Sequence, residues 1–237
     1  MEKKAVKIGI IGAMDVEVNL LKESAEISRR VVKADMEFCE GTLGSTDVVI
    51  AKCGMGKVNS GVCAQILIDT FGVSHIVNTG VAGGLSKNLK VGDVVVAVDA
   101  VQWDFDVTIL GFRKGEVPYT GKYAFVCDEN LRRKALKAAR EAAPNSNVIE
   151  ARACAGDTFI QTPEQADAIT SAFGAASIEM ESGAIGQVCC LNHVPFAVIR
   201  VISDTTTEDV ESSSYKDVEA MTAELCAAIT QKMIMNF

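Results

Sequence analysis

The stretch Ser74-His75-Ile76-Val77-Asn78-Thr79-Gly80-Val81-Ala82-Gly83-Gly84 joins a short apolar run to a glycine-rich segment. Residues 74–78 are typical of a strand buried on both faces, as in a mixed or parallel sheet. The three glycines allow a ligand to approach the backbone closely, although a plain tight turn also uses one or two of them. The stretch therefore predicts an α/β fold with a ligand site at the carboxyl ends of its strands.

Further elements of the same fold are indicated on both sides of this stretch. Apolar runs rich in Val and Ile predict strands at residues 6–11, 47–53, 93–100 and 195–202. Helical spacing of apolar residues predicts helices at residues 57–70, 129–142, 181–191 and 215–235. Such alternation places helices on both faces of a sheet. We therefore predict a single-domain three-layer α/β/α fold over residues 1–237, with a central mixed, largely parallel twisted sheet.

Composition argues against several classes of partner. Asp and Glu number 31 against 23 Lys and Arg, for a net charge of −8, and no basic cluster is visible, which disfavours nucleic acids and anionic membranes. Eight cysteines without C-x-x-C spacing are typical of reduced core residues, and two histidines argue against a multi-histidine metal site. We expect a cytoplasmic protein with no metal or other cofactor.

Two pairs of carboxylates lie after or within apolar segments. Asp15 and Glu17 stand at a helix start after residues 6–11, where complementing the helix dipole is the plain explanation. Glu179 and Glu181 flank Met180 within an apolar region, which is unusual for surface acids. A carboxylate in such a place can accept hydrogen bonds from ribose hydroxyls. Either structural or binding roles fit these acids taken singly.

Two other segments have residue types suited to a ligand site. The apolar strand 195–202 contains Arg200 and runs into Ser203-Asp204, where a helix N-cap is the plain alternative. Phe159 and Ile160 follow another apolar run, and a base could stack on the ring and bond to the backbone. Such stacking is worth roughly 1–3 kcal/mol per base in nucleic-acid binders, although Phe159 could also be a core residue.

Together these motifs resemble those of the 5′-methylthioadenosine/S-adenosylhomocysteine nucleosidases, a family of the nucleoside phosphorylase superfamily. The resemblance extends over nearly the whole chain and rests on residues 8–14, 54–58, 78–85, 91–93, 106–108, 156–160, 179–181 and 194–204. It implies a nucleoside phosphorylase-like fold. It also implies hydrolysis of the N-glycosidic bond of 5′-substituted adenosines (5′-methylthioadenosine, S-adenosylhomocysteine, 5′-deoxyadenosine) in methionine salvage, without a cofactor.

The resemblance also implies residue roles. Asp204 would protonate N7 of adenine, Glu181 would hold the ribose hydroxyls, and Glu17 would deprotonate the attacking water, oriented by Arg200. The remaining residues expected at the substrate are Met14, Met55, Val81, Gly83, Phe159, Ile160, Ile178, Glu179, Met180, Ser203 and Tyr215. We further hypothesise that Arg200 faces Glu17 and the water rather than Asp204, because a nearby guanidinium would lower the pKa of the acid that must donate a proton.

The sequence departs from the family pattern at two places. Val81 stands where many members have serine, which removes a hydroxyl near the water and puts the rate in doubt. Residues 204–214 diverge, and Tyr215 takes the place of a phenylalanine that covers the pocket. The resemblance further implies a homodimer, with the apolar residues Leu110, Phe112 and Pro118 near the interface.

Alternatives remain open at this point. Phosphorolysis by a purine nucleoside phosphorylase requires a cationic phosphate site, whereas Asp15, Glu17 and Val81 occupy the loops concerned. A catalytically silent nucleoside-binding module would not need an acid placed for N7. Aminodeoxyfutalosine would also fit a pocket lined by adaptable methionines, so the 5′-substituent is undetermined.

Overall fold

The computed structural model describes residues 6–205 and 212–237, except for the side chains of residues 212–216. The strands in this part of the chain are β1 Lys7–Gly12, β2 Glu26–Lys33, β3 Met36–Leu43, β4 Thr46–Lys52, β5 His75–Gly84, β6 Val94–Gln102, β7 Phe125–Val126, β8 Val148–Ala155, β9 Ala175–Glu179 and β10 Phe196–Thr205. The helices are α1 Asp15–Ser24, α2 Lys57–Phe71, the 3₁₀ turn η1 Thr108–Leu110, α3 Glu129–Ala142, α4 Pro163–Phe173, α5 Ser182–Leu191 and α6 Ser212–Met235.

All the strands belong to one mixed sheet in the order β10-β6-β8-β9-β5-β1-β4-β3-β2, with β7 paired to β6. The long strand β5 runs parallel to both β1 and β10. Its last residues also pair antiparallel with β9, and β10 pairs antiparallel with β6. Strands β5, β9, β8, β6 and β10 therefore close into a ring, and this closure brings the end of β5 beside the ends of β9 and β10.

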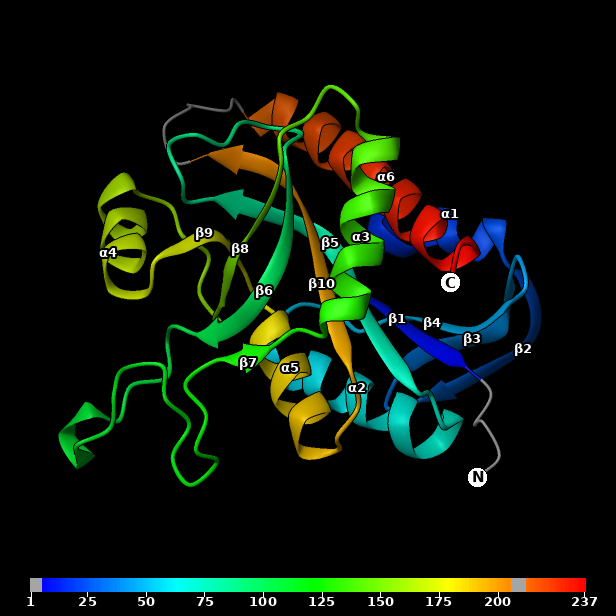
Figure 1. The fold of residues 1–237 in the computed structure, drawn as a ribbon, viewed down its shortest axis with the longest axis horizontal. Coiled ribbons are helices and arrows are strands. Elements are labelled where there is room, and N and C mark those ends of the chain that lie inside the picture. The colour runs from blue at the N-terminus through cyan, green and yellow to red at the C-terminus, as the bar shows by residue number, and fades with distance from the viewer. Residues whose placement is uncertain (1–5, 206–211) are drawn as a thin grey trace.

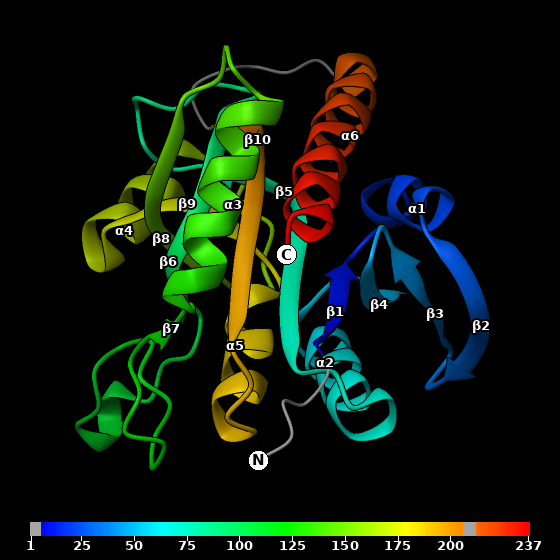
Figure 2. The ribbon, with the colours of Figure 1, turned by 45° about the vertical axis from the view of Figure 1, so that its right-hand side comes forward.

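Helices cover both faces of the sheet (Figures 1 and 2). Ile8 and Ile10 of β1 belong to a buried cluster shared with α1, α3 and α6. Ile11 belongs to a second cluster shared with α2 and α5. Neighbouring residues of one strand thus enter different layers, because side chains alternate between the two faces of a strand. No helix in residues 6–205 and 212–237 is both long and apolar enough to cross a membrane.

The predicted α/β class, with a mixed sheet between helical layers, is confirmed. The helix α3 has the predicted bounds, and α2 ends one residue later than predicted. The prediction did not include β2, β3, β7, β8, β9 and α4, nor how far α1 extends. Because half of the strand pairings are antiparallel, the sheet is less parallel than expected. That all 237 residues form one domain stays a prediction.

Two helical glycines offer a matched test of the packing between helices and sheet. A Cβ on Gly186 of α5 would lie 2.9 Å from Phe125 Cβ and from the Phe196 ring, whereas a Cβ on Gly61 of α2 would meet nothing closer than 3.8 Å. Gly61→Ala should raise the free energy of unfolding by about 0.5–1 kcal/mol through helix propensity. Gly186→Ala should lower it by about 1–3 kcal/mol through overpacking. Urea unfolding of both variants would measure the difference, and stabilisation by Gly186→Ala would contradict this packing.

Candidate active site

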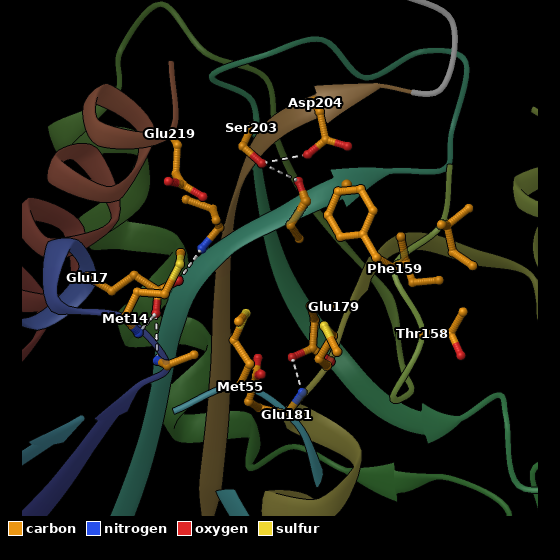
Figure 3. Close-up of a pocket in the computed structure, with 17 residues that line it drawn as sticks. Met14, Glu17, Met55, Thr158, Phe159, Glu179, Glu181, Ser203, Asp204 and Glu219 are labelled. Carbon is orange, nitrogen blue, oxygen red and sulfur yellow. Dashed lines mark hydrogen bonds between the residues drawn. The ribbon is translucent and has the colours of Figure 1, made fainter. Parts of the chain in front are cut away.

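A pocket opens where the carboxyl ends of β1, β4 and β10 meet the second half of β5 and the end of β9 (Figure 3). Its lining residues are Ala13, Met14, Glu17, Met55, Val81, Ala82, Gly83, Thr158, Phe159, Ile160, Ile178, Glu179, Met180, Glu181, Ser203, Asp204 and Glu219. They come from seven separate segments of the chain. No Lys, Arg or His is among these described lining residues, so the inner surface carries acids and apolar groups.

Glu17 lies in the first turn of α1 and points into the pocket rather than to solvent. Its Oε2 accepts hydrogen bonds from the N–H groups of Ala13 (2.6 Å) and Met14 (3.0 Å), which closes the start of the helix. Its Oε1 accepts from the Val81 N–H at 3.0 Å. That contact uses the backbone and is therefore independent of the side chain at position 81. By contrast, Asp15 forms a surface ion pair with Lys52.

Arg200 of β10 lies beneath the pocket and is almost completely buried. Its Nη2 donates to Asn78 Oδ1 at 2.6 Å and to Glu179, and Glu181 Oε2 is 3.8 Å away. A Cβ on Gly80 would overlap both Arg200 Nη1 and Glu17 Oε1, so these two atoms converge over the bare backbone of that glycine. The guanidinium therefore sits among three carboxylates.

The two acids around Met180 differ in what they contact. Glu179 accepts from the N–H groups of Glu181 and Ser182, from the Ser182 hydroxyl and from Arg200. Its carboxylate is thus occupied by the protein, in part as a cap on the start of α5. Glu181 accepts from the Gly56 N–H at 2.9 Å through Oε1. Of the predicted pair, only Glu181 keeps an oxygen without a direct hydrogen bond that a ribose hydroxyl could reach.

Burial makes the ionised forms of the pocket acids costly. Burial raises the pKa of Glu17 above its usual value, against the opposing effects of Arg200 and the three N–H donors. Burial and the neighbouring Glu179 carboxylate raise the pKa of Glu181 to about 7, although Arg200 opposes them. Burial disfavours the charged form of Arg200, but Glu179, Glu181 and Glu17 more than compensate and raise its pKa. The pocket therefore holds one carboxyl group, that of Glu181, able to gain or lose a proton near neutrality.

The opposite wall has the residues expected for a base. Ser203 and Asp204 lie within β10 rather than at a helix start, and the Ser203 hydroxyl donates to Asp204 Oδ1 at 2.7 Å. Phe159 lines the pocket with 57% of its surface exposed, so it is not a core residue. Figure 3 places its ring near Asp204, across the pocket from Glu17. A planar ligand between them would meet an aromatic face and a carboxyl edge.

The structure brings together the predicted residues Met14, Glu17, Met55, Val81, Gly83, Phe159, Ile160, Ile178, Glu179, Met180, Glu181, Ser203 and Asp204. Arg200 lies behind them and makes no described contact with Asp204, in keeping with our hypothesis for its direction. The Tyr215 side chain lies outside the described residues. Sequence reasoning missed Ala13, Ala82, Thr158 and Glu219 on the lining, and Asn78 and Gly56 as partners of the site. Glu219 belongs to α6, far along the chain and without a motif of its own.

The residues predicted near an interface lie on the segment between β6 and β7. Leu110 is 66% exposed and its neighbour Ile109 is 93% exposed, while Phe112 and Pro118 are half-buried. Met55 and Val58, at the start of α2, are exposed as well. The described residues contain no cluster of three or more His, Cys, Asp or Glu arranged to hold a metal ion.

Known proteins share both the fold and the sequence. A family model described as the phosphorylase superfamily matches residues 7–235. The 5′-methylthioadenosine/S-adenosylhomocysteine nucleosidase of Exiguobacterium sp. strain AT1b is 39% identical over 234 residues, covering 96% of this chain and 99% of that protein. The crystal structure of the Neisseria meningitidis nucleosidase of the same name, in complex with methylthio-immucillin-A, has a TM-score of 0.91 at 33% identity, covering 98% of this chain and 99% of that one.

These matches identify the chain as a member of the phosphorylase superfamily. Within it, the chain belongs to the 5′-methylthioadenosine/S-adenosylhomocysteine nucleosidase family, as its motifs predicted. A futalosine hydrolase of Helicobacter pylori is also similar, with a TM-score of 0.90 at 28% identity over 98% of this chain and 99% of that one. Similarity of fold therefore does not distinguish the 5′-substituents on which such proteins act.

The raised pKa of Glu181 predicts a pH-dependent stability. The folded chain keeps a proton on Glu181 that the unfolded chain releases between pH 4.5 and about 7, so this residue makes stability fall as pH rises through that window. Glu181→Gln removes the effect. The difference between the melting temperatures of Glu181→Gln and the native protein should therefore shift by several degrees in favour of the variant when the pH is changed from 5 to 8. Exposed Glu23→Gln is the control, and parallel curves for Glu181→Gln and the native protein would contradict the prediction.

Proposed function

We propose that this protein hydrolyses the N-glycosidic bond of 5′-substituted adenosines and releases adenine and the substituted ribose. The single observation that carries the proposal is the placement of three acids, Glu17, Glu181 and Asp204, around one pocket that also presents Phe159. Membership of the nucleosidase family supports it. The site suits the reaction, because carboxyl groups can carry out both proton transfers and can stabilise the cation that develops.

Two of the acids act on protons. Asp204 protonates N7 and so makes adenine a neutral leaving group, while the Ser203 hydroxyl fixes the direction of its carboxyl. Glu17 removes a proton from the water, and its raised pKa makes it a stronger base than an exposed glutamate. The three N–H groups that bind Glu17 fix the orientation of its carboxylate. Arg200 Nη1, close to Glu17 above Gly80, orients the same water.

The remaining residues bind and polarise the nucleoside. Phe159 stacks on the base and the backbone of Ile160 bonds to its edge, while Glu181 accepts hydrogen bonds from the ribose hydroxyls. As the bond breaks, positive charge grows on the ribosyl ring. The fixed carboxylates near the ring stabilise this charge better than mobile water would.

The pocket is better suited to water than to phosphate as the nucleophile. A phosphorylase holds phosphate with cationic side chains or several free N–H groups. Among the described residues, Arg200 is the cation that contacts the pocket acids, but it is already bound to Asn78 and Glu179, and the Val81 N–H is taken by Glu17. A phosphate dianion would also face Glu17 and Glu181 at short range.

Substrate choice and assembly form the finer part of the proposal. Methylthioadenosine and adenosylhomocysteine are the expected substrates, with 5′-deoxyadenosine and aminodeoxyfutalosine as alternatives that a methionine-lined pocket also accommodates. We also infer a homodimer, because Met55 both lines the pocket and is 62% exposed, so that a second copy covering it would close the site. A cytoplasmic location stays a prediction.

Incubation of the purified protein with 5′-methylthioadenosine should release adenine at the same rate in phosphate-free and phosphate-containing buffer, as measured by chromatography.

Asp204→Asn should lower kcat by about 10²–10⁴-fold, because the variant keeps the shape of the side chain but cannot protonate N7. The control Asp15→Asn changes an exposed acid of the same type nearby and should leave kcat unchanged. Strict phosphate dependence would indicate a phosphorylase, and full activity of Asp204→Asn would remove that residue from the mechanism.

The assembly can be tested with a charged substitution on the exposed apolar loop. Leu110→Glu should convert the dimer to a monomer in analytical ultracentrifugation and raise KM for methylthioadenosine by about tenfold or more, because the pocket loses its cover. The same change at Val32, an exposed apolar residue on β2, is the matched control and should do neither. A native protein that sediments as a monomer would disprove the homodimer.

A further inference from the structure

A closed circuit of polar contacts lies beside the pocket, made by residues that the proposed chemistry does not use. Lys57 begins α2, Asp104 follows β6 and Asp157 follows β8. Lys57 Nζ contacts Asp104 Oδ1 at 2.7 Å, and Asp104 Oδ2 accepts from the Asp157 N–H at 2.9 Å. Asp157 Oδ1 in turn accepts from the Lys57 N–H at 2.8 Å. Each residue of this Lys57–Asp104–Asp157 circuit therefore contacts the other two.

The circuit lies next to both the proposed ribose side and the proposed base side of the pocket. Successive N–H groups at the start of α2 donate in two directions, that of Gly56 to Glu181 and that of Lys57 to Asp157. The residues after Asp157 are 158–160, which line the pocket on the side proposed for the base. Figure 3 shows Thr158 and Phe159 on one side and Glu181 on another. The start of α2 is thus the common support of the ribose carboxylate and the base loop, residues 156–160.

Two of the three residues of the circuit are shielded from water, whereas Asp157 is exposed. The side chains of Lys57 and Asp104 are only 18% and 19% exposed, so water screens their attraction less than that of a surface ion pair. A Cβ on Gly156 would lie 3.0 Å from Asp104 Cγ, and one on Gly56 would lie 3.1 Å from Asp157 Oδ1. A shift of the Asp104 side chain would therefore displace the backbone of the base loop.

We propose that Asp104, with its charge balanced by Lys57, is a positioning residue that sets the place of the base loop relative to Glu181. Asp104 does not line the pocket and acts through Asp157 and Lys57. The inference rests on the proposed function. Free adenine has no ribose, so its affinity reports on the base loop by itself, whereas the acids that move protons, Asp204 and Glu17, lie on other segments.

The test is to measure adenine binding by calorimetry, together with KM and kcat for methylthioadenosine, in Asp104→Asn and Lys57→Met. Both variants should raise the adenine Kd and KM by roughly tenfold, since small displacements of positioning groups cost about this much or more, while kcat changes by less than about threefold. Lys57→Arg keeps the cation and should restore both constants. Lys57→Met changes a side chain outside the pocket lining and leaves Asp104 in place, so it provides the test if Asp104→Asn fails to fold.

The matched control is Asp99→Asn, which breaks another partly buried ion pair, one that joins the two strands after which Asp104 and Asp157 follow. Asp99 of β6 contacts Arg152 of β8 at 2.7 Å, with side chains 13% and 25% exposed. This variant should lower the melting temperature and leave adenine Kd and KM unchanged. If Asp104→Asn and Lys57→Met behave in the same way, the circuit is only structural and the proposal is wrong. A native protein that binds adenine but does not cleave the nucleoside would overturn the proposed function and still allow this comparison.

Discussion

Arg200 places a full positive charge in the middle of the sheet, almost out of contact with water. Burying such a charge costs several kcal/mol unless opposite charges and hydrogen-bond acceptors surround it, and removing one partner of a buried pair typically costs about 3–5 kcal/mol. The partners here are Asn78, Glu179, Glu181 and, above Gly80, Glu17. They come from β5, from both sides of the β9–α5 corner and from α1. These segments must therefore meet around β10, and the same contacts that hold the fold also build the pocket.

The charges in this cluster do not balance, because three carboxylates face one guanidinium. In the free protein this excess is unfavourable, and part of it is relieved by the raised pKa values of Glu17 and Glu181. A ligand that develops positive charge during its reaction would reverse the balance, whereas a phosphate would add to the repulsion. The arrangement thus favours a cationic transition state over an anionic co-substrate, and it does so at the expense of stability in the empty pocket.

The sequence predicts those features that depend on local pattern. Five strands were predicted because they are rich in Val and Ile and are buried on both faces. Strand β2 was not predicted, because most of its residues, among them Arg29 and Arg30, are exposed at the sheet edge. The site acids stood out because each lies within or soon after an apolar segment of the sequence. The partners of Arg200 could not be predicted, because they depend on the closure of β5, β9 and β10 into a ring. Glu219 reaches the pocket only through the packing of α6.

Ring closure has a further consequence for how the chain behaves in a crowded solution. A strand of an open sheet offers unpaired N–H and C=O groups on which other chains can grow, but β10 is paired on both sides, to β5 and β6. In the described part of the chain the long free edge is left to β2, which carries Arg29, Arg30 and Lys33. Charged residues on an edge strand oppose the addition of another strand. The architecture thereby limits aggregation through strand pairing and leaves contact between folded copies to side-chain surfaces.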